Sequence, residues 1–264
     1  NFKSKDTKKT KNPKIFLGGK GANLSEMGRM SLPVPPGFTI STKVCEIFYK
    51  DKKKLNSKLI SQIKRELKVV EKDVSKKFGN LKNPLLLSVR SGARVSMPGM
   101  MDTILNLGLN DKTVIALAKK TSNGRFAKDS YRRFIQMYSN VVLGIDSYLF
   151  EDLIDNYKLT KGVIQDTELD EDDWDGLILN FKDVVKEKTK KIFPQDVNEQ
   201  LWGAIGAVFL SWNSKRAKTY RKINYIPDHW GTAVNVQAMV FGNMGNDCAT
   251  GVAFTRNPST GKKE

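Results

Sequence analysis

The segment LLLSVRSGARVSMPGMMDTILNLG, residues 85–108, constrains the fold more than any other part of the chain. Its first residues, LLLSV, form a short apolar run directly after Asn83 and Pro84, which predicts a buried strand. Arg90 then marks the end of that predicted strand, and several methionines follow it. The fold must therefore bring positive charge and polarisable apolar side chains together at the end of one strand.

Other segments divide into extended and helical stretches. Residues 32–41, LPVPPGFTIS, cannot form a helix interior because prolines lack the backbone donor and fix φ, so we expect an extended segment leading to a short strand. Residues 15–27, IFLGGKGANLSEM, pass through a glycine turn into a helical pattern. From Ser57 to Phe78 apolar residues recur at helical spacing, with lysines on the other faces, which predicts an amphipathic helix.

The second half of the chain changes character. Apolar stripes over residues 111–193 predict a helical block, interrupted by an acidic loop at 165–176, QDTELDEDDWDG. A further helix is expected over 201–212, where small residues permit close packing. The alternation in TAVNVQAMVFG, residues 232–242, predicts a strand, and TGVAFT, residues 250–255, predicts a second strand after a turn.

Composition excludes several protein classes. Hydrophobic residues make up 39% of the 264 residues and charged residues 28%, and no apolar run approaches the roughly 20 residues of a membrane span, so we expect no membrane segment. Cys45 and Cys248 match no zinc-site spacing, and His229 is the single histidine. We therefore expect a reducing compartment, no disulfide and no structural zinc site.

The formal charge of +17 is unevenly distributed. Residues 1–82 hold 21 Lys or Arg against 7 Asp or Glu, whereas residues 146–175 hold 11 acids against 2 lysines. Two interpretations stay open, a basic surface that faces an anion or lysines that cover solvated helix faces. Residues 3–14, KSKDTKKTKNPK, indicate a loose, solvated tail without the apolar segment of a signal peptide or the arginines of a transit peptide.

The GGKG pattern at residues 18–21 is the first candidate for chemistry. Glycines allow a ligand to approach the backbone amides, and Lys20 adds a charge that could neutralise phosphate oxygens. The pattern is not a Walker P-loop, because Lys20 is followed by Gly21 and no glycine stands at the required upstream position. By itself, GGKG is more typical of a turn before a helix than of a phosphate-binding loop.

The SVRSGARVSMPGMMDT segment strengthens the case for an anion site. Arg90 can direct two donors at one phosphate, and Ser91, Gly92 and Ser96 supply hydroxyls and accessible amides beside it. Methionines offer a surface for a purine ring, although core filling is their commoner use. A strand end with solvated arginines and inward methionines remains an open alternative.

The NVQAMVFGN strand is the third candidate element. Backbone groups of an extended segment can offer adenine a donor and an acceptor in one plane, while Met239 or Val240 covers the ring. A plain core strand has the same composition. His229 has no evident triad partner in the sequence, so we interpret it as non-catalytic.

Taken together, these segments resemble the N-terminal nucleotide-binding region of pyruvate phosphate dikinase. The resemblance covers almost the whole chain and rests on long motifs in the family's order, which are GGKGANLSEM, LPVPPGFTI, LLLSVRSGARVSMPGMMDTILNLGLND, FPQDVNEQLWGAIGAVF, WGTAVNVQAMVFGNMG and TGVAFTRNPSTG. Phosphoenolpyruvate synthase shares the general order of these motifs, but the sequence SMPGMMDTILNLG resembles the dikinase motif more closely.

This resemblance implies an α+β fold of the ATP-grasp type with a helical insertion, truncated at its C-terminal end. Residues 1–110 and 196–240 would form the first ATP-grasp subdomain, residues 111–195 the helical insertion, and residues 241–264 the incomplete start of the second subdomain. The family moves the β-phosphate of ATP to a histidine on a central domain and then to pyruvate in a C-terminal barrel. The implied partners are therefore ATP or AMP, Mg²⁺, that phosphohistidine domain and the pyruvate-binding barrel, within a homodimer.

By motif matching, Lys20 and Arg90 fall on the family's contacts to the ATP phosphates. Gln237, Met239 and Val240 would belong to the strand beside adenine. The motif also matches around residues that we treat as second-rank contacts without assigned roles, namely Arg94, Asp102 and Thr103.

Two departures limit what the resemblance implies. The sequence stops before the part of the family pattern that carries the Glu and Gln magnesium ligands and another phosphate-binding Arg, so we expect the metal ligands to lie beyond Glu264 and the chain alone to be inactive. His229 also stands where the family pattern leads us to expect an acidic residue. The alternatives are a phosphoenolpyruvate synthase type of domain, a basic nucleic-acid-binding module and a non-catalytic docking domain, and we expect a cytoplasmic enzyme or an organellar one.

Overall fold

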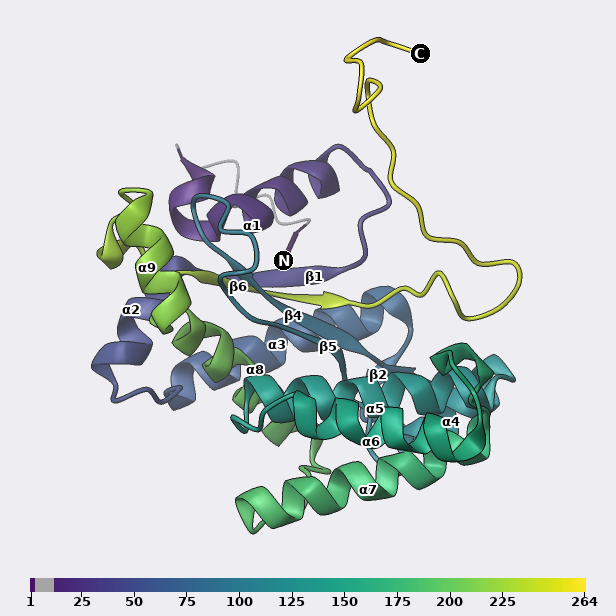
Figure 1. Ribbon diagram of the computed structural model, residues 1–264. Helices are drawn as coiled ribbons and strands as arrows, with labels where there is room; N and C mark the ends of the chain where they lie inside the picture. Colours follow the sequence, from purple (N-terminus) through teal and green to yellow (C-terminus); the bar gives the residue numbers. More distant parts are fainter. Residues whose placement is uncertain (3–11) are drawn as a thin grey trace.

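The computed structural model describes residues 1–2 and 12–264, so residues 3–11 of the predicted tail lie outside the described residues. At its end the prediction was wrong, because Pro13 and Lys14 begin a helix. A four-stranded antiparallel sheet occupies the centre, with strand order β1-β6-β4-β5 (Figure 1). The strands of this sheet are β1 (Gly37–Ile40), β4 (Leu87–Gly92), β5 (Thr103–Leu107) and β6 (Ala233–Ala238). Two very short strands, β2 (Lys77–Phe78) and β3 (Pro84–Leu85), pair in parallel beside it.

Helices cover both faces of the sheet and extend beyond it. Helix α1 (Pro13–Arg29) lies over one face, and α2 (Thr42–Lys50), α3 (Ser57–Val74) and α8 (Val197–Ser211) lie under the other (Figure 1). A block of helices packs at the β5 side of the sheet, formed by α4 (Thr113–Thr121), α5 (Gly124–Val141), α6 (Tyr148–Lys161) and α7 (Glu171–Thr189). Helix α9 (Lys215–Ile223) and the 3-10 turns η2 (Asp166–Glu168) and η3 (Asp228–Trp230) complete the elements of the described residues.

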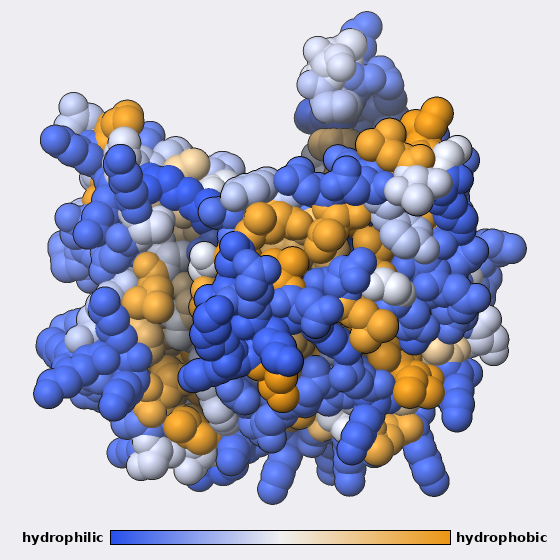
Figure 2. Space-filling view, turned by 60° about the horizontal axis from the view of Figure 1, so that its bottom comes forward, coloured by the Kyte–Doolittle hydropathy of each residue, from blue (hydrophilic) through white to orange (hydrophobic). Residues whose placement is uncertain are grey.

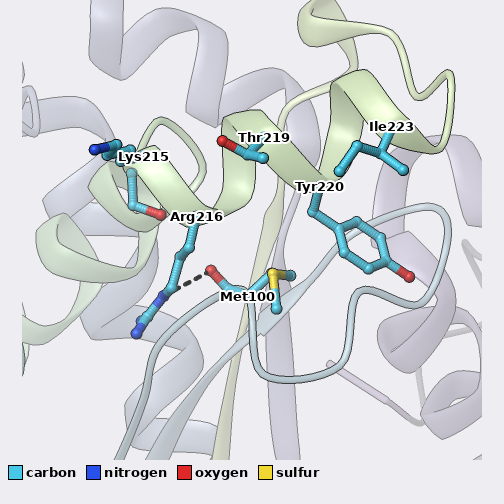
Figure 3. Close-up of a pocket in the computed structure, with 7 residues that line it drawn as sticks. Met100, Lys215, Arg216, Thr219, Tyr220 and Ile223 are labelled. Carbon is cyan, nitrogen blue, oxygen red and sulfur yellow. Dashed lines mark hydrogen bonds between the residues drawn. The ribbon is translucent and has the colours of Figure 1, made fainter.

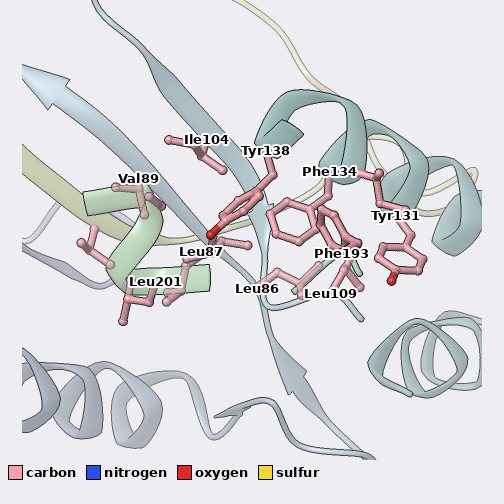
Figure 4. Close-up of a cluster of buried hydrophobic side chains, with 14 of the residues drawn as sticks. Leu86, Leu87, Val89, Ile104, Leu109, Tyr131, Phe134, Tyr138, Phe193 and Leu201 are labelled. Atoms are coloured by element: carbon pink, nitrogen blue, oxygen red, sulfur yellow. The ribbon is translucent and has the colours of Figure 1, made fainter. Parts of the chain in front are cut away.

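The hydrophobic core runs without a break from the sheet into the helical block. Figure 4 shows Leu87, Val89 and Ile104 of the sheet in the same cluster as the rings of Tyr138 and Phe193. Phe193 stacks edge-on with both Phe134 and Tyr138, with ring centroids 5.6 Å apart in each pair. The predicted helical block is confirmed, since the apolar stripes of α5 and α7 are the surfaces that this core buries.

Several sequence predictions were wrong in extent, among them the strand expected over residues 232–242, which ends at Ala238. The helix expected from Ser57 to Phe78 ends at Val74, because Ser75 takes the left-handed conformation, with φ of 52°, and Phe78 enters β2. The strand expected at 85–89 is interrupted at Leu86 and then continues to Gly92, so that Arg90 lies inside β4 rather than at its end.

The acidic loop expected at residues 165–176 is also shorter than predicted. Helix α7 already begins at Glu171, because Asp170 and Asp173 form a capping box in which each side chain accepts a hydrogen bond from the other's backbone N–H. Acidic residues in the first turn of a helix also interact favourably with the positive end of the helix dipole. The acids that suggested a loop therefore start a helix.

The strand expected at residues 250–255 is wrong, because residues 239–264 form no helix or strand. Val252 is 80% exposed and Phe254 is 64% exposed, so the alternating pattern has nothing to pack against in this structure. In Figure 1 the segment leaves β6 and runs away from the body to the C-terminus. On the face shown in Figure 2, hydrophilic residues surround areas of hydrophobic ones, which gather mainly over the middle of that face.

Candidate functional site

A pocket of about 480 Å³ lies between α1 and the loop that joins β4 to β5, and we call it the α1–β4 pocket. Its lining comes from α1, the end of β4, the connecting loop and the start of β5, and consists of Gly19, Lys20, Asn23, Ser91, Gly92, Ala93, Val95, Ser96, Met97, Pro98, Gly99, Met101 and Thr103. The two glycine-rich segments that the sequence singled out thus line one pocket, although they are about seventy positions apart.

Direct backbone contact holds these two segments together. The N–H of Gly19 donates a hydrogen bond to the carbonyl oxygen of Ala93, with an N–O distance of 2.8 Å. At Gly18 the chain turns out of the helical conformation, with φ of 67° and ψ of 175°, and a Cβ there would lie 1.7 Å from the oxygen of Gly92. Only glycine permits this approach, and the bend makes Gly19 and Lys20 the start of a new helical segment with partial positive charge.

Arg90 lies close enough to Lys20 to lower the pKa of its amine. Burial lowers the pKa of Lys20, and the positive charge of Arg90 lowers it further. Neither side chain forms an ion pair with any residue in the described part of the chain. Arg90 is exposed on β4 and is not among the residues that line the pocket, so it stands beside the pocket rather than inside it.

A row of four polar residues crosses the face of the sheet that α1 covers. The strand register pairs Thr39 of β1 with Asn235 of β6, Asn235 with Arg90 of β4, and Arg90 with Thr103 of β5. The neighbouring row, on the opposite face, is wholly apolar and contains Phe38, Val236, Val89 and Ile104. Because side chains alternate along a strand, one face of the sheet belongs to the core and the other to the candidate site.

Arg94 and Asp102 contact other parts of the protein instead of the pocket. The guanidinium of Arg94 lies 5.1 Å from the ring centre of Trp230, and its buried Nε has no hydrogen-bond partner among the described residues. Asp102 forms an ion pair with Arg216 of α9, and burial raises the pKa of its carboxyl while Arg216 opposes that rise. Arg216 also donates to the carbonyl oxygen of Met100 at 3.2 Å, which connects α9 to the loop between β4 and β5 (Figure 3).

Of the residues expected on the strand beside adenine, Gln237 lies in β6, whereas Met239 and Val240 follow its last residue, Ala238. Gln237 is largely buried and its side-chain amide donates to the carbonyl oxygen of Pro35 at 3.0 Å. The backbone N–H of Met239 donates to the oxygen of Leu86, the residue before β4, at 3.0 Å, so the chain stays beside this segment for one residue after β6. Val240 is 76% exposed and begins the segment that leaves the sheet.

A second cavity of about 490 Å³ adjoins the first through Met101 and Thr103, which line both. Arg132 and Arg133 of α5, which were not predicted from the sequence, also line this cavity. Arg132 is buried and forms ion pairs with Asp129 and with Asp166. A charged residue on the apolar stripe of a predicted helix was the signal that could have drawn attention to it.

Other chemistry is limited within the described ranges, residues 1–2 and 12–264. No group of three or more His, Cys, Asp or Glu in these ranges could hold a metal ion. His229 is exposed in η3 and does not line the α1–β4 pocket. In the same ranges, no helix is both long and apolar enough to cross a membrane.

Comparison with known proteins identifies the family to which the chain belongs. The family model described as the AMP/ATP-binding domain of pyruvate phosphate dikinase matches residues 15–68 and 52–264. The pyruvate, phosphate dikinase of Rhizobium meliloti is 56% identical over 248 residues, and that of Clostridium symbiosum is 56% identical over 249 residues. The chloroplastic pyruvate, phosphate dikinase of Flaveria pringlei is 54% identical over 254 residues.

The matches cover nearly all of this chain but a small part of each relative. They include 94% of the chain and 28% of the Rhizobium and Clostridium proteins, and 96% of the chain and 26% of the Flaveria protein. The chain thus spans little more than a quarter of the length of these relatives. On these grounds it belongs to the pyruvate phosphate dikinase family, in which it corresponds to the N-terminal AMP/ATP-binding domain.

Proposed function

We propose that the α1–β4 pocket and the polar row beside it bind the phosphates of ATP, with Lys20 and Arg90 as the two principal cations. The observation that carries this proposal is the proximity of two positive side chains that lack an acidic partner in the described part of the chain. Like charges held close together repel each other, and a polyphosphate between them would relieve that repulsion. The hydroxyl of Thr103, which lines the pocket, would add a neutral donor.

The adenine would lie near Met239 and Val240, at the end of β6 where the chain leaves the sheet. Met239 stands beside Leu86, and Arg90 is four residues farther along the neighbouring strand. At roughly 3.3 Å per residue, the two ends of this site are about 13 Å apart. An extended nucleotide suits that separation, with its base at one end and its phosphates at the other.

The ATP-grasp architecture belongs to the same proposal. Residues 1–110 and 196–240 would form the first subdomain, residues 111–195 the helical insertion, and residues 241–264 the first part of the second subdomain. The exposed Val252 and Phe254 support this division, because they are apolar residues that the rest of the chain leaves uncovered. Their proposed packing partner is the remainder of the second subdomain in the intact enzyme.

Magnesium would arrive with the nucleotide, because Mg²⁺ commonly binds substrate phosphates and only one or two carboxylates. The described residues do not fit a protein metal site, and we assign no step to the metal. In the intact enzyme, the bound ATP would react with phosphate and pyruvate to give AMP, diphosphate and phosphoenolpyruvate through a phosphohistidine on another domain. We propose that this enzyme is a homodimer located in the cytoplasm or an organelle.

Calorimetric titration with MgATP tests the phosphate assignment. Lys20→Ala and Arg90→Ala should each weaken binding by about 1.5–3 kcal/mol, the range for a lost charge-assisted contact. Lys120→Ala and Arg65→Ala are matched controls, because both side chains are exposed on helices that contribute no residue to the pocket. Unchanged affinity in both pocket variants would remove the site assignment.

The pH dependence of the same titration gives a second test. Since the pKa of free Lys20 is lowered, its charge is lost earlier as pH rises, whereas bound phosphate would stabilise the charged form. MgATP affinity should therefore decline as pH rises through the pKa of Lys20 in the free protein. Lys20→Ala should lack that decline, and an identical decline in this variant would assign it to another group.

The excess of basic residues in positions 1–82 supports a second candidate function, non-specific binding of nucleic acid. Such binding weakens steeply with salt because phosphate contacts release counterions. Gel retardation of a short RNA at 50 and 200 mM salt distinguishes the two functions. Retardation that is absent, or that does not change with salt, would eliminate this candidate.

A further inference from the structure

Asn235 lies at the centre of the polar row, beneath the place where α1 crosses β4. Its strand, β6, pairs with β1 on one side and β4 on the other (Figure 1). The side chain is only 2% exposed, so it is covered by α1 rather than by solvent. It therefore lies between the two segments that carry Lys20 and Arg90 and does not line the α1–β4 pocket itself.

The hydrogen bonds of Asn235 are fulfilled on one side only. Its Oδ1 accepts a hydrogen bond from the hydroxyl of Thr39 at 2.7 Å. Its Nδ2 has no hydrogen-bond partner among the described residues, although it is fully buried. Because burial of an unpaired amide donor is unfavourable, the stability of the sheet alone does not account for an asparagine at this position.

The carboxamide contacts both glycine segments closely. A Cβ added at Gly21 would lie 2.9 Å from Asn235 Oδ1, and a Cβ added at Gly92 would lie 2.6 Å from Asn235 Nδ2. The amide group therefore fills the space between α1 and β4 that the missing glycine side chains leave. Since the group is planar, the hydrogen bond from Thr39 to its oxygen also fixes the direction of its nitrogen.

We propose that Asn235 is a positioning residue, which sets the spacing between the bend at Gly18–Gly21 and β4 and thereby holds Lys20 and Arg90 at the separation that one polyphosphate needs. Thr39 orients the amide, and the amide supports both glycine segments from below. This inference rests on the proposed function, because the spacing matters only if both cations bind the same anion. Asn235 does not touch the nucleotide in this arrangement.

Two substitutions disturb the support in different ways. Asn235→Leu keeps the approximate volume and removes the amide, whereas Thr39→Val keeps the shape of the neighbour and removes the hydroxyl that orients the amide. Thr39→Ser restores the hydroxyl and is the conservative control. Val185→Ala is a control for general destabilisation, because Val185 is fully buried in α7, outside the sheet.

Hydrogen exchange of the free chain tests the spacing without any ligand. The Gly19 amide, which is bonded to Ala93, should exchange about tenfold faster in Asn235→Leu and Thr39→Val than in the unaltered chain. Thr39→Ser should exchange at the original rate, and Val185→Ala should lose protection in α7 but not at Gly19. Unchanged protection of Gly19 in both disruptive variants would overturn the proposal.

Calorimetric titration with MgATP completes the test. The dissociation constant should rise about tenfold in Asn235→Leu and Thr39→Val, and stay within about twofold in the two controls. Faster exchange at Gly19 with unchanged affinity would also overturn the proposal, because Asn235 would then be merely structural. If the unaltered chain does not bind MgATP, the proposed function fails for this chain, and Asn235 then has no role in nucleotide binding. Exchange at Gly19 still decides separately whether Asn235 sets the spacing between α1 and β4.

Discussion

Helices α5 and α7 are held in the core by large aromatic side chains, whereas α1 meets the sheet through glycines. In the helical block, the rings of Phe150 and Phe181 are 4.9 Å apart and both side chains are fully buried. Under α1, by contrast, Gly21 faces the side chains of Thr39 and Asn235 at distances that leave no room for a Cβ. One contact is made by side chains and the other by the backbone.

The helical block supplies stability in this molecule, whereas the site under α1 supplies the capacity to bind an anion. Aromatic pairs contribute about 0.5–1.5 kcal/mol beyond the burial of their surface, so the helical block can stabilise the whole domain. A buried polar group without a partner costs about 1–3 kcal/mol, and the site under α1 contains such a group at Asn235. The aromatic core thus offsets the cost of a polar site that brings cations close together.

Phe181→Ala should remove a buried ring from the aromatic core of the helical block and should have the largest effect on stability. Because Phe181 is fully buried, its truncation should lower the free energy of unfolding by about 3–5 kcal/mol, as measured by urea denaturation. Leu179→Ala is the matched control, since Leu179 lies on the same helix and is 61% exposed. Equal losses in the two variants would contradict the importance of the aromatic core.

Gly18→Ala should break the backbone contact of the other region. The positive φ alone should cost about 1–3 kcal/mol, and the added methyl group would collide with the oxygen of Gly92 and separate α1 from β4. We expect both a lower urea midpoint and a loss of MgATP binding. Gly176→Ala is the control, because a Cβ at Gly176 meets nothing within 4 Å and should stabilise α7 by about 0.5–1 kcal/mol.

Asp166→Asn should remove a small, pH-dependent contribution to the stability of the helical block, and its effect should be the smallest of the three. Burial by itself would raise the pKa of Asp166, but the hydrogen bond from Lys158 and the charge of Arg132 outweigh it and lower the pKa. A carboxyl whose pKa is lowered on folding stabilises the fold above its unfolded pKa of about 3.9, and that stabilisation is lost as pH falls through the folded pKa. The ion pair is partly exposed, so we expect less than about 1 kcal/mol.

Urea unfolding between pH 5 and pH 2 measures this contribution. Stability of the unaltered chain should fall more steeply with acid than stability of Asp166→Asn. Asp152→Asn is the control, because Asp152 is exposed and forms no described ion pair or hydrogen bond. A slope that is equally reduced in the control would attribute the effect to net charge.

Much of the fold follows from local patterns that the sequence displays. Prolines before Gly37 predict an extended entry into β1, and the stripes of α5, α7 and α8 predict buried helix faces. The predictions failed where tertiary contacts decide the outcome. Phe78 joins β2 because β3 lies beside it, and Val252 and Phe254 stay uncovered because no sheet receives them.

The candidate site divides in the same way. Lys20 and Arg90 could be selected from the sequence because glycines and charged residues adjoin a predicted strand, and their role as phosphate contacts stays a prediction. Thr39 and Asn235 could not be selected, because a threonine and an asparagine in ordinary strands carry no local signal. Only the pairing of β1, β6 and β4 brings them beneath the glycine segments.

The sequence by itself determined the periodic helices, the proline-defined strand entry and the glycines that permit close backbone approach, because these depend on the conformational preferences of neighbouring residues. The tertiary structure alone decided that Thr39, Asn235, Arg90 and Thr103 share one row. Register between distant strands is set by which apolar residues can pack together in the core, and the polar residues on the opposite face follow that choice.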